Sequence, residues 1–568
     1  MRRIFTLRFF AHAVPCVLSA LLLWAAFPPV GETCAVVFAV APMLALSRLC
    51  SPKRSAWTWF ACGMLFWTAT LSWMPAIVKN NGPLPLVLLG WFGLAALCAG
   101  YFALFGWLHA RTWRRVRASG SGWWAVAAIV VAEPVLWAGT EWLRGWLFTG
   151  FAWNFLGTAV GAVPRLAAPA RIGGVYLVSA LVVLVNGVFA TLICRLVAQM
   201  RAREEGAWSA WGTPDGKTGR LMRPLQTALP LAVALAFHFA AASSSSDGIE
   251  AAQMRVMLVQ RNAPCIFSRR DKVENPYEAF GRLMASAKVA RPDLVVWAES
   301  AMTEFGTRLN DESAKSVASY FAEFTGGAAL MSGGDWWHFA ESEKGPVRKV
   351  QNAAALFSCT ATNISVQAYG KQHLVPFGEY IPFDKWITPL QRLSPIGVSL
   401  WPGEARVLRL ERDDGRVFML APIICYEDTD PVLSRRAARL GAQAIVLMTN
   451  DSWFSYSMEP LQHAMQAVLR AIETGLPVIR VGNSGVTGVV SPSGRARWLE
   501  DGEGRAIVDA PGVMCEAVSV PARPRATPYV RFGDWPLGVL FALCLVFSLL
   551  SGRAAIFFKS PIAHHPKI

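Results

Sequence analysis

Three reactive side chains each follow an apolar, strand-like run of the sequence. Glu299 comes directly after one such run, Lys371 follows a second, and Cys425 ends a third. A cysteine thiol is a nucleophile, a half-buried carboxylate can remove its proton, and an ammonium group can stabilise a developing oxyanion. Together the three residues supply the parts of an acyl-transfer site, in which a cysteine thioester can be resolved by an amine.

Cys425 is expected at a turn between a strand and a helix. The run 418–424 is apolar and β-prone, and the cluster 428–431 is typical of a helix start. Backbone N–H groups at a helix N-terminus favour the thiolate over the thiol. Taken alone, Cys425 is more often a small buried hydrophobe, and Glu299 and Lys371 are more often solvated surface charges. Only their combination indicates chemistry.

The region from about residue 250 to 527 alternates strand-like and helical segments. Strands are expected at 254–260, 293–297, 328–332, 364–369, 418–424, 442–448 and 478–481, and helices at 277–290 and 459–474. Such alternation is typical of an α/β domain in which helices cover layered strands.

Apolar regions flank this domain on both sides. The 568-residue chain is 54% hydrophobic and only 16% charged, whereas a soluble domain carries about 25% charge. About eight membrane helices are expected, at 9–30, 34–46, 57–73, 84–108, 123–140, 175–197, 225–242 and 535–550. The composition therefore predicts an integral membrane protein that carries one soluble domain.

Basic residues concentrate at alternate ends of the predicted helices. They occur at the N-terminus, after the second, fourth and sixth helices, and in the C-terminal tail. The positive-inside rule places all of these in the cytoplasm and the soluble domain on the opposite side, which in a bacterium is the periplasm. The net charge of +16 thus reflects orientation, and without a nucleic-acid-binding motif we expect no nucleic-acid partner.

The domain organisation follows from this alternation. Residues 1–245 are expected to hold transmembrane helices 1–7, residues 250–527 the periplasmic catalytic domain, residues 535–552 the last transmembrane helix, and residues 553–568 a cytoplasmic tail.

The residues around the three reactive side chains resemble motifs of the nitrilase, or carbon–nitrogen hydrolase, superfamily. Glu299 lies in the motif WAESA at 297–301, and Lys371 lies in the long motif YGKQHLVPFGEYIP at 369–382. Further matches follow in order at 450–454, 462–463, 480–485 and 527–536, and in the membrane part at 72–73, 141–144 and 150–153. With apolar helices on both sides, the chain resembles the apolipoprotein N-acyltransferase family. Ala298 and Ala152 stand where that family usually has proline.

This resemblance implies a fold and a reaction. The fold is an α-helical transmembrane bundle of about eight helices plus an α/β nitrilase-like domain, built as an α-β-β-α sandwich. The reaction is N-acylation of the N-terminal diacylglyceryl-cysteine of a bacterial lipoprotein, the last step of lipoprotein maturation. The implied partners are a membrane phospholipid as acyl donor and a diacylated apolipoprotein as acceptor. We expect a monomer in the bacterial inner membrane, with no cofactor.

The resemblance also implies residue roles. Cys425 would form the acyl thioester, Glu299 would be the general base, and Lys371 would stabilise the oxyanion. Glu379 would be a second essential carboxylate, although a carboxylate that only braces Lys371 is an equally good interpretation.

Tyr426 and Glu427 would shape the site beside the nucleophile. We expect no metal, because His373 and His463 have no ligand-type partners at helical or loop spacing.

Two other functions remain open. A membrane-tethered nitrilase-type amidase or hydrolase would use the same three residues, but one helix would suffice as its tether. A transporter with an extracellular domain would carry charge inside the membrane, and Glu133, Glu141 and Arg144 are the candidates for it.

Overall fold

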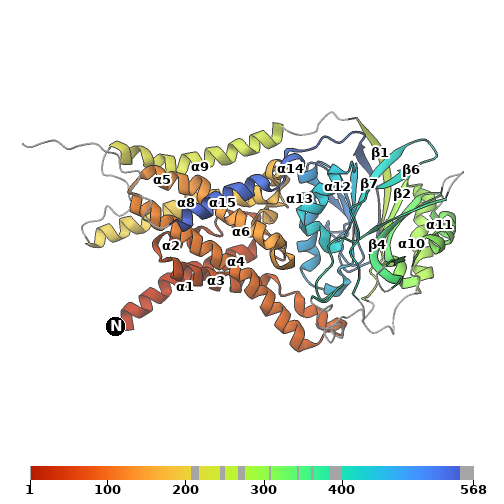
Figure 1. Cartoon of the computed structure of the whole chain (residues 1–568), viewed down its shortest axis with the longest axis horizontal. Helices are drawn as coiled ribbons and strands as arrows, with labels where there is room; N and C mark the ends of the chain where they lie inside the picture. The colour runs from red at the N-terminus through yellow and green to blue at the C-terminus, as the bar shows by residue number, and fades with distance from the viewer. Residues whose placement is uncertain are drawn as a thin grey trace, which may run out of the picture.

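The computed structural model consists of a long helical bundle that meets a domain of two β-sheets (Figure 1). It describes residues 2–205, 217–243, 250–265, 275–305, 309–325, 327–341, 345–359, 364–382 and 399–550. The tail expected at 553–568 lies outside these residues, as does most of the junction between the seventh helix and the soluble domain.

The bundle is built from apolar helices. They are α1 (Arg2–Ala25), α2 (Ala41–Leu49), α3 (Pro52–Thr70), α4 (Leu84–Ser119), α5 (Gly122–Ala127) with α6 (Glu133–Trp146), α8 (Ala170–Glu205), α9 (Lys217–Ser243) and α15 (Trp535–Leu549). Within the described residues, 5 helical spans are long and apolar enough to cross a membrane, and three shorter apolar helices accompany them. The predicted bundle of about eight helices is confirmed.

Helix α4 is longer than the sequence predicted. The prediction ended it at residue 108, but it continues to Ser119 through a basic segment. Arginine is a good helix former, and here its side chain also finds acceptors on a neighbouring helix. Arg111 Nε donates to the carbonyl of Ser548 at 3.0 Å, near the end of α15. The basic residues expected in a loop therefore lie on a helix, at the end of the bundle far from the sheets.

A buried ion pair ties four helices together near that same end. Arg48 donates from Nε and Nη2 to Glu133, both at 2.8 Å, and from Nη1 to Thr191 at 2.8 Å. His109 Nε2 lies 2.8 Å from Glu133, and Trp113 Nε1 donates to Glu133 at 2.7 Å. The charge of Glu133 is thus enclosed by partners from α2, α4 and α8, and it braces the bundle.

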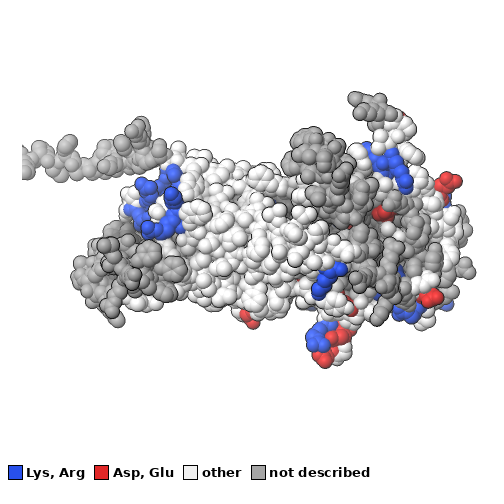
Figure 2. Space-filling model, turned by 90° about the horizontal axis from the view of Figure 1, so that it is seen from below, with Lys and Arg blue, Asp and Glu red and all other residues white. Residues whose placement is uncertain are grey.

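The face of the bundle seen in Figure 2 is nearly free of charge over most of its length. Lys and Arg gather at the end away from the sheets. A charge-free band with a basic end is typical of helices that span a membrane.

The α/β domain contains two 6-stranded sheets. The first has the order β12-β1-β2-β3-β4-β5 and the second the order β11-β10-β9-β8-β7-β6. The strands are β1 (Ala251–Gln260), β2 (Leu294–Trp297), β3 (Ala329–Ala340), β4 (Val347–Cys359), β5 (Ile364–Gly370), β6 (Leu408–Glu411), β7 (Val417–Ile424), β8 (Ala444–Thr449), β9 (Val478–Gly482), β10 (Gly488–Val490), β11 (Ala496–Trp498) and β12 (Gly512–Pro521). One cluster of buried residues joins the facing surfaces of the two sheets.

Helices cover both outer faces, which confirms the predicted α-β-β-α sandwich. Helices α10 (Pro276–Ala290) and α11 (Asp311–Thr325) contact the first sheet, and α12 (Pro431–Arg439) and α13 (Glu459–Thr474) contact the second. Strands β1 and β12 pair along their whole length, with Ala251 opposite Pro521. The chain therefore enters and leaves the domain on neighbouring strands.

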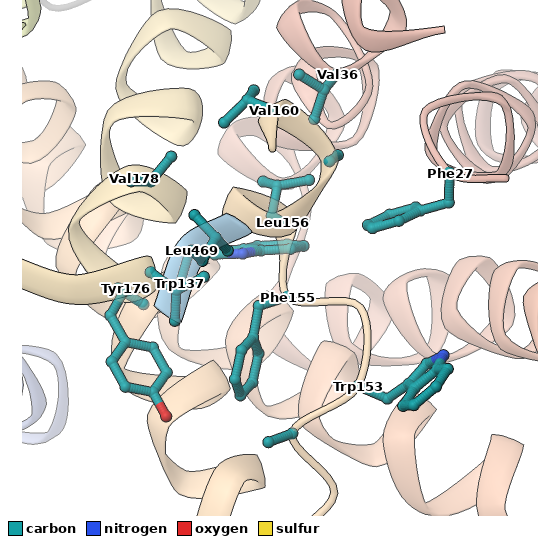
Figure 3. Packing of buried hydrophobic residues seen from close by; sticks show 14 of the residues in the cluster. Phe27, Val36, Trp137, Trp153, Phe155, Leu156, Val160, Tyr176, Val178 and Leu469 are labelled. Atoms are coloured by element: carbon teal, nitrogen blue, oxygen red, sulfur yellow. The ribbon is translucent and has the colours of Figure 1, made fainter. Parts of the chain in front are cut away.

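The second sheet reaches the bundle through α12 and α13 (Figure 1). A single cluster of buried residues runs from the bundle through these helices to the outer face of the sheet. Figure 3 shows Leu469 of α13 among bundle side chains that include Trp137, Leu156 and Tyr176. The domain is therefore seated on the bundle by close packing, not only tethered to it.

Gln462 of α13 is the polar centre of this joint. Its Oε1 accepts hydrogen bonds from Trp153 Nε1 at 2.8 Å, Asn154 Nδ2 at 3.2 Å and Trp73 Nε1 at 3.3 Å. Its Nε2 donates to the carbonyl of Pro28 at 3.0 Å. One buried amide thus binds three separate segments of the bundle.

Candidate active site

Glu299, Lys371 and Cys425 come together at the carboxyl ends of β2, β5 and β7. Lys371 Nζ lies 3.5 Å from Glu299 Oε1. Of these two charges, Glu299 raises the pKa of the Cys425 thiol and Lys371 lowers it. Lys371 is 1% exposed and Glu299 is 7% exposed. The structure therefore brings the Glu299 and Lys371 side chains together beside the elbow of Cys425.

Both oxygens of Glu299 are held in place. Asn352 Nδ2 donates to Oε1 at 2.7 Å, and the backbone N–H of Asn450 donates to Oε2 at 2.8 Å. Gly333 of β3 lies against the turn that carries Glu299: a Cβ at Gly333 would come within 2.6 Å of Glu299 Cα. Only glycine permits so close an approach. The carboxylate is therefore held by Asn352 of β4 and by the backbone just after β8, while Gly333 of β3 packs against its turn.

Lys371 is kept charged by two carboxylates. Its Nζ donates to Glu379 Oε1 at 3.0 Å, and Glu299 is its second ionic partner. Burial acts to lower the pKa of Lys371, but Glu379 and Glu299 outweigh it and raise that pKa above its ordinary value. Glu379 is itself anchored by the N–H of Val375, which donates to Oε2 at 2.8 Å. The expected contact between Glu379 and Lys371 is present.

Asn352 is a site residue that sequence reasoning missed. Its Nδ2 donates to Glu299 and to Glu379, both at 2.7 Å, so one amide holds the two carboxylates. Strand β4, which carries it, was not predicted either, because its centre is a run of alanines with low β-propensity. The sequence feature that could have indicated Asn352 is that it is a single amide directly before a buried apolar run.

Cys425 lies at a sharp elbow after β7. Its φ is +52°, a left-handed conformation that is uncommon for a residue with a side chain. A one-turn 3-10 helix (Cys425–Thr429) follows, and α12 begins only at Pro431, where Asp430 caps the N–H of Val432 at 2.9 Å. The predicted elbow is present, and α12 begins at Pro431, within the cluster 428–431 where the helix start was expected.

The thiol of Cys425 is not favoured as a thiolate in the way the sequence suggested. Burial and the charge of Glu299 raise its pKa well above the ordinary value, and the opposing effect of Lys371 is smaller. A 3-10 helix begins at Cys425, yet burial and the charge of Glu299 dominate the pKa of the thiol. A neutral thiol needs a base to remove its proton, and Glu299 is near enough to act on it.

Glu427 joins the end of β7 to the loop after β5. Its Oε1 accepts from the N–H groups of Gln372 at 2.6 Å and His373 at 3.1 Å, and its Oε2 accepts from the N–H of Ile424 at 2.8 Å. The hydroxyl of Tyr369 donates to both oxygens, at 3.0 and 2.9 Å. This fully buried carboxylate sets the position of Lys371 relative to Cys425 through the backbone.

Tyr426 connects the site to the bundle. Its hydroxyl donates to the carbonyl of Gly150 at 3.4 Å, and its ring stacks on Phe151 with centres 6.4 Å apart. The same loop is held by Arg144 Nη1, which donates to the carbonyls of Phe151 and Trp153, both at 2.7 Å. Arg144 therefore braces a loop beside the nucleophile, by contacts within the bundle.

An ion network lies behind the elbow. His463 Nε2 is 2.9 Å from Asp428 and its Nδ1 is 3.0 Å from Asp451, while Arg480 lies 3.3 Å from both carboxylates. Burial acts to lower the pKa of His463, but Asp428 and Asp451 raise it to about 10. The imidazolium and the guanidinium together neutralise the two aspartates.

His463 does have ligand-type partners at helical spacing, contrary to the expectation from the sequence. Ligand atoms of Asp451, Glu459 and His463 lie within 4.8 Å of one another, and Glu459 is one helical turn before His463. Among the described residues this is the arrangement with metal-ligand geometry. Arg480 donates to Asp451 from 3.3 Å, so a fixed positive charge already occupies the position beside these ligands.

Two family models match the chain. The model described as apolipoprotein N-acyltransferase N-terminal domain matches residues 19–188, and the model described as carbon–nitrogen hydrolase matches residues 278–511. The apolipoprotein N-acyltransferase of Geobacter metallireducens is 28% identical over 551 residues, which cover 97% of this chain and 96% of the relative. That of Pseudomonas syringae pv. tomato is 30% identical over 522 residues, covering 89% and 90%.

A solved amidase from a Nesterenkonia species is also similar, at 19% identity. The match covers 52% of this chain and 99% of the amidase, with a TM-score of 0.31, which is too low to carry an argument.

Proposed function

Since this chain belongs to the apolipoprotein N-acyltransferase family, we propose that Cys425, Glu299 and Lys371 carry an acyl chain from a membrane phospholipid to the amine of a lipoprotein. The chain is a multi-pass membrane acyltransferase with an α/β nitrilase-like domain. The acceptor is the α-amine of the N-terminal diacylglyceryl-cysteine. The observation that supports the residue assignment is that the buried carboxylate and the ammonium lie 3.5 Å apart beyond strands β2 and β5 of the first sheet, and that both act on the thiol that follows β7 of the second sheet.

In the first half-reaction Glu299 takes the proton of the Cys425 thiol, and the sulfur attacks the carbonyl carbon of a phospholipid ester. The ammonium of Lys371 stabilises the oxyanion of the tetrahedral intermediate. The carbon–oxygen bond then breaks, and the proton on Glu299 passes to the leaving alkoxide. The products are a lysophospholipid and an acyl thioester on Cys425.

In the second half-reaction the amine of the lipoprotein attacks the thioester. Glu299 accepts a proton from the amine, Lys371 again stabilises the oxyanion, and the carbon–sulfur bond breaks to leave an amide. The thiolate of Cys425 recovers its proton from Glu299. Water must be kept out between the two steps, because hydrolysis of the thioester would release free fatty acid.

The seating of the domain on the bundle supports a donor that stays in the membrane. Each CH₂ group buried in lipid is worth about 0.8 kcal/mol, so pulling a long acyl chain into water costs on the order of 10 kcal/mol. Tyr426, next to the nucleophile, contacts the bundle loop at Gly150. A site held at the bundle can receive the chain without extracting it.

We further propose the bacterial inner membrane as the location, with the domain 250–527 in the periplasm. The basic residues of α4 and the sheets lie at opposite ends of the bundle. This separation supports an orientation with the basic end in the cytoplasm.

Incubation with acyl-labelled phospholipid tests the proposal. Without acceptor, mass spectrometry is expected to find the acyl group on Cys425; with a diacylated lipopeptide, the label should move to the lipopeptide amine. Cys425→Ser should abolish both products, whereas the control Cys515→Ser, at an exposed cysteine of β12, should keep them.

Labelled lipopeptide formed by Cys425→Ser would overturn the thioester mechanism. Release of free fatty acid, with no transfer even when lipopeptide is present, would favour the hydrolase instead.

A further inference from the structure

Arginines also gather at the end of the bundle that faces the sheets, where the positive-inside rule predicts few. Arg523, Arg525 and Arg531 lie in the segment between β12 and α15, and all three are exposed. Arg435 and Arg439 of α12 lie against the same segment. We call these five residues the arginine collar.

The collar is held together by contacts between α12 and α14 (Pro528–Phe532). Arg439 donates from Nε to the carbonyl of Val530 at 2.8 Å and from Nη2 to that of Arg531 at 2.5 Å. The guanidinium of Arg435 lies 5.9 Å from the centre of the Tyr529 ring. The arginines of α12 are thus bound to the segment that leads into the last helix.

The other three arginines keep their charge available. In the described part of the chain, no hydrogen bond or ion pair is found for the side chains of Arg523, Arg525 and Arg531. The nearest acidic residue along the chain, Asp534, is bound to the hydroxyl of Tyr529 at 2.8 Å. Within the described residues, these guanidinium groups are therefore not neutralised.

The collar lies at the level where the chain enters the membrane. Helix α15 begins at Trp535, directly after α14, and Figure 1 places α14 where the bundle meets the two-sheet domain. Phe532 and Trp535 are 55% and 62% exposed. Exposed aromatic residues at a helix end are typical of the lipid headgroup region. Unpaired arginines at that level face phosphate groups, which guanidinium binds with two parallel hydrogen bonds.

We propose that the arginine collar binds the headgroups of anionic phospholipids on the catalytic side of the membrane. This goes beyond the acyl transfer itself, because the collar is a surface for the lipid bilayer and contributes no reacting group. Binding there fixes the height and tilt of the domain relative to the headgroups. The attraction is electrostatic, so it weakens as salt rises.

Lipid retention by the full-length protein tests this proposal. The protein in detergent is mixed with phosphatidylglycerol or phosphatidylcholine, and native mass spectrometry counts the lipids that stay bound. The wild type should retain more phosphatidylglycerol than phosphatidylcholine, and R523Q/R525Q/R531Q should lose this preference. Each arginine removed should lower the retention of phosphatidylglycerol by at most about fivefold. R348Q/R409Q/R505Q removes three exposed arginines from the sheets and turns of the domain and should keep it.

Two outcomes would overturn the proposal. One is equal retention of phosphatidylglycerol by the wild type and the collar variant. The other is full displacement of the lipid by millimolar inorganic phosphate, which would indicate a phosphate site instead of a lipid surface. If the variant does not fold, the wild type alone decides: its preference must fall as potassium chloride is raised. This readout does not depend on acyl transfer, so its failure leaves the proposed reaction untouched.

Discussion

Asn352 explains how two carboxylates can be buried beside one lysine. A single ammonium cannot satisfy all the oxygens of Glu299 and Glu379, and an unpaired buried carboxylate is costly. The amide of Asn352 donates to both without adding charge. It therefore holds the two carboxylates in position on either side of Lys371.

Asn352→Leu should lower the acylation rate on the order of 10- to 100-fold, because Glu299 loses the donor that orients it. The loss should appear in kcat with labelled phospholipid while the protein remains folded. Gln351→Leu, at the neighbouring position whose side chain donates to the carbonyl of Pro402, is the matched control and should stay near wild type. A fully active Asn352→Leu enzyme would remove Asn352 from the site.

The raised pKa of the Cys425 thiol predicts an alkaline reactivity profile. Its folded pKa lies above the ordinary value of 9.0, so the neutral thiol persists through neutral pH and the thiolate forms only at higher pH. Alkylation of Cys425 by iodoacetamide, followed by mass spectrometry, should keep accelerating above pH 9. Lys371→Ala should slow it further, since Lys371 acts to lower that pKa. A plateau below pH 8 would contradict this assignment.

At this scale the sequence identifies residues whose neighbours along the chain are distinctive. Glu299, Lys371 and Cys425 each end a strand inside a characteristic motif, so their meeting could be predicted. Asn352 could not, because its role depends on two residues distant in sequence. The contact between His463 and Asp428 was missed for the same reason, because the two residues are distant in sequence. The contact between His463 and Glu459 was missed although the two residues are one helical turn apart.

At the scale of elements, the site depends on how the β7 elbow is fastened to the loop after β5. Glu427 makes this connection by accepting three backbone N–H groups from the two segments. Neither segment alone specifies the position of Lys371 relative to Cys425. The buried carboxylate of Glu427, which accepts hydrogen bonds from both segments, fixes this relative position.

Glu427→Gln should weaken that connection. The glutamine amide has one acceptor oxygen in place of two, and its NH₂ group would face the backbone N–H groups that donate to Glu427. We expect a loss of about 1–3 kcal/mol in the free energy of unfolding and a larger loss in acyl-enzyme formation. Thermal unfolding and the Cys425 adduct measure the two effects. Glu404→Gln, at an exposed carboxylate of the same domain, should change neither. An unchanged adduct in Glu427→Gln would show that the fastening is dispensable.

Element boundaries were predicted well where periodicity was clear and poorly where partners decide them. The expected helix 459–474 coincides with α13, whose apolar and polar positions alternate at helical spacing. Strand β3 extends to Ala340, well past the expected 328–332, because pairing with β4 carries it into a polar, aromatic stretch. Such an extension is set by the neighbouring strand and is not encoded locally.

At the scale of the whole molecule, the bundle and the domain are joined through α13. Gln462 turns toward the bundle, and the next residue, His463, turns toward the carboxylates behind the elbow. Adjacent residues of one helix thus contact the membrane part and the site. The presence of about eight membrane helices could be predicted from composition, but this joint could not, because it pairs residues from opposite ends of the chain.

Gln462→Leu should destabilise the joint, since it removes a buried amide that serves several bundle segments. The midpoint of thermal unfolding in detergent should fall by several degrees, and acyl transfer should fall with it. Gln466→Leu is the control on the same helix: its buried amide has no hydrogen-bond partner in the described structure, so its loss should be neutral or stabilising. Equal behaviour of the two variants would argue against a specific joint.

The pairing of Ala251 with Pro521 has a consequence for how such a molecule can be assembled from parts. The first and last strands of the α/β domain are hydrogen-bonded neighbours, about 5 Å apart, so the entire catalytic fold is a cassette spliced into a helical protein at one point. Cutting it out leaves two ends that a short turn can reconnect. The α/β domain can therefore be removed or inserted along the chain without rethreading the membrane helices.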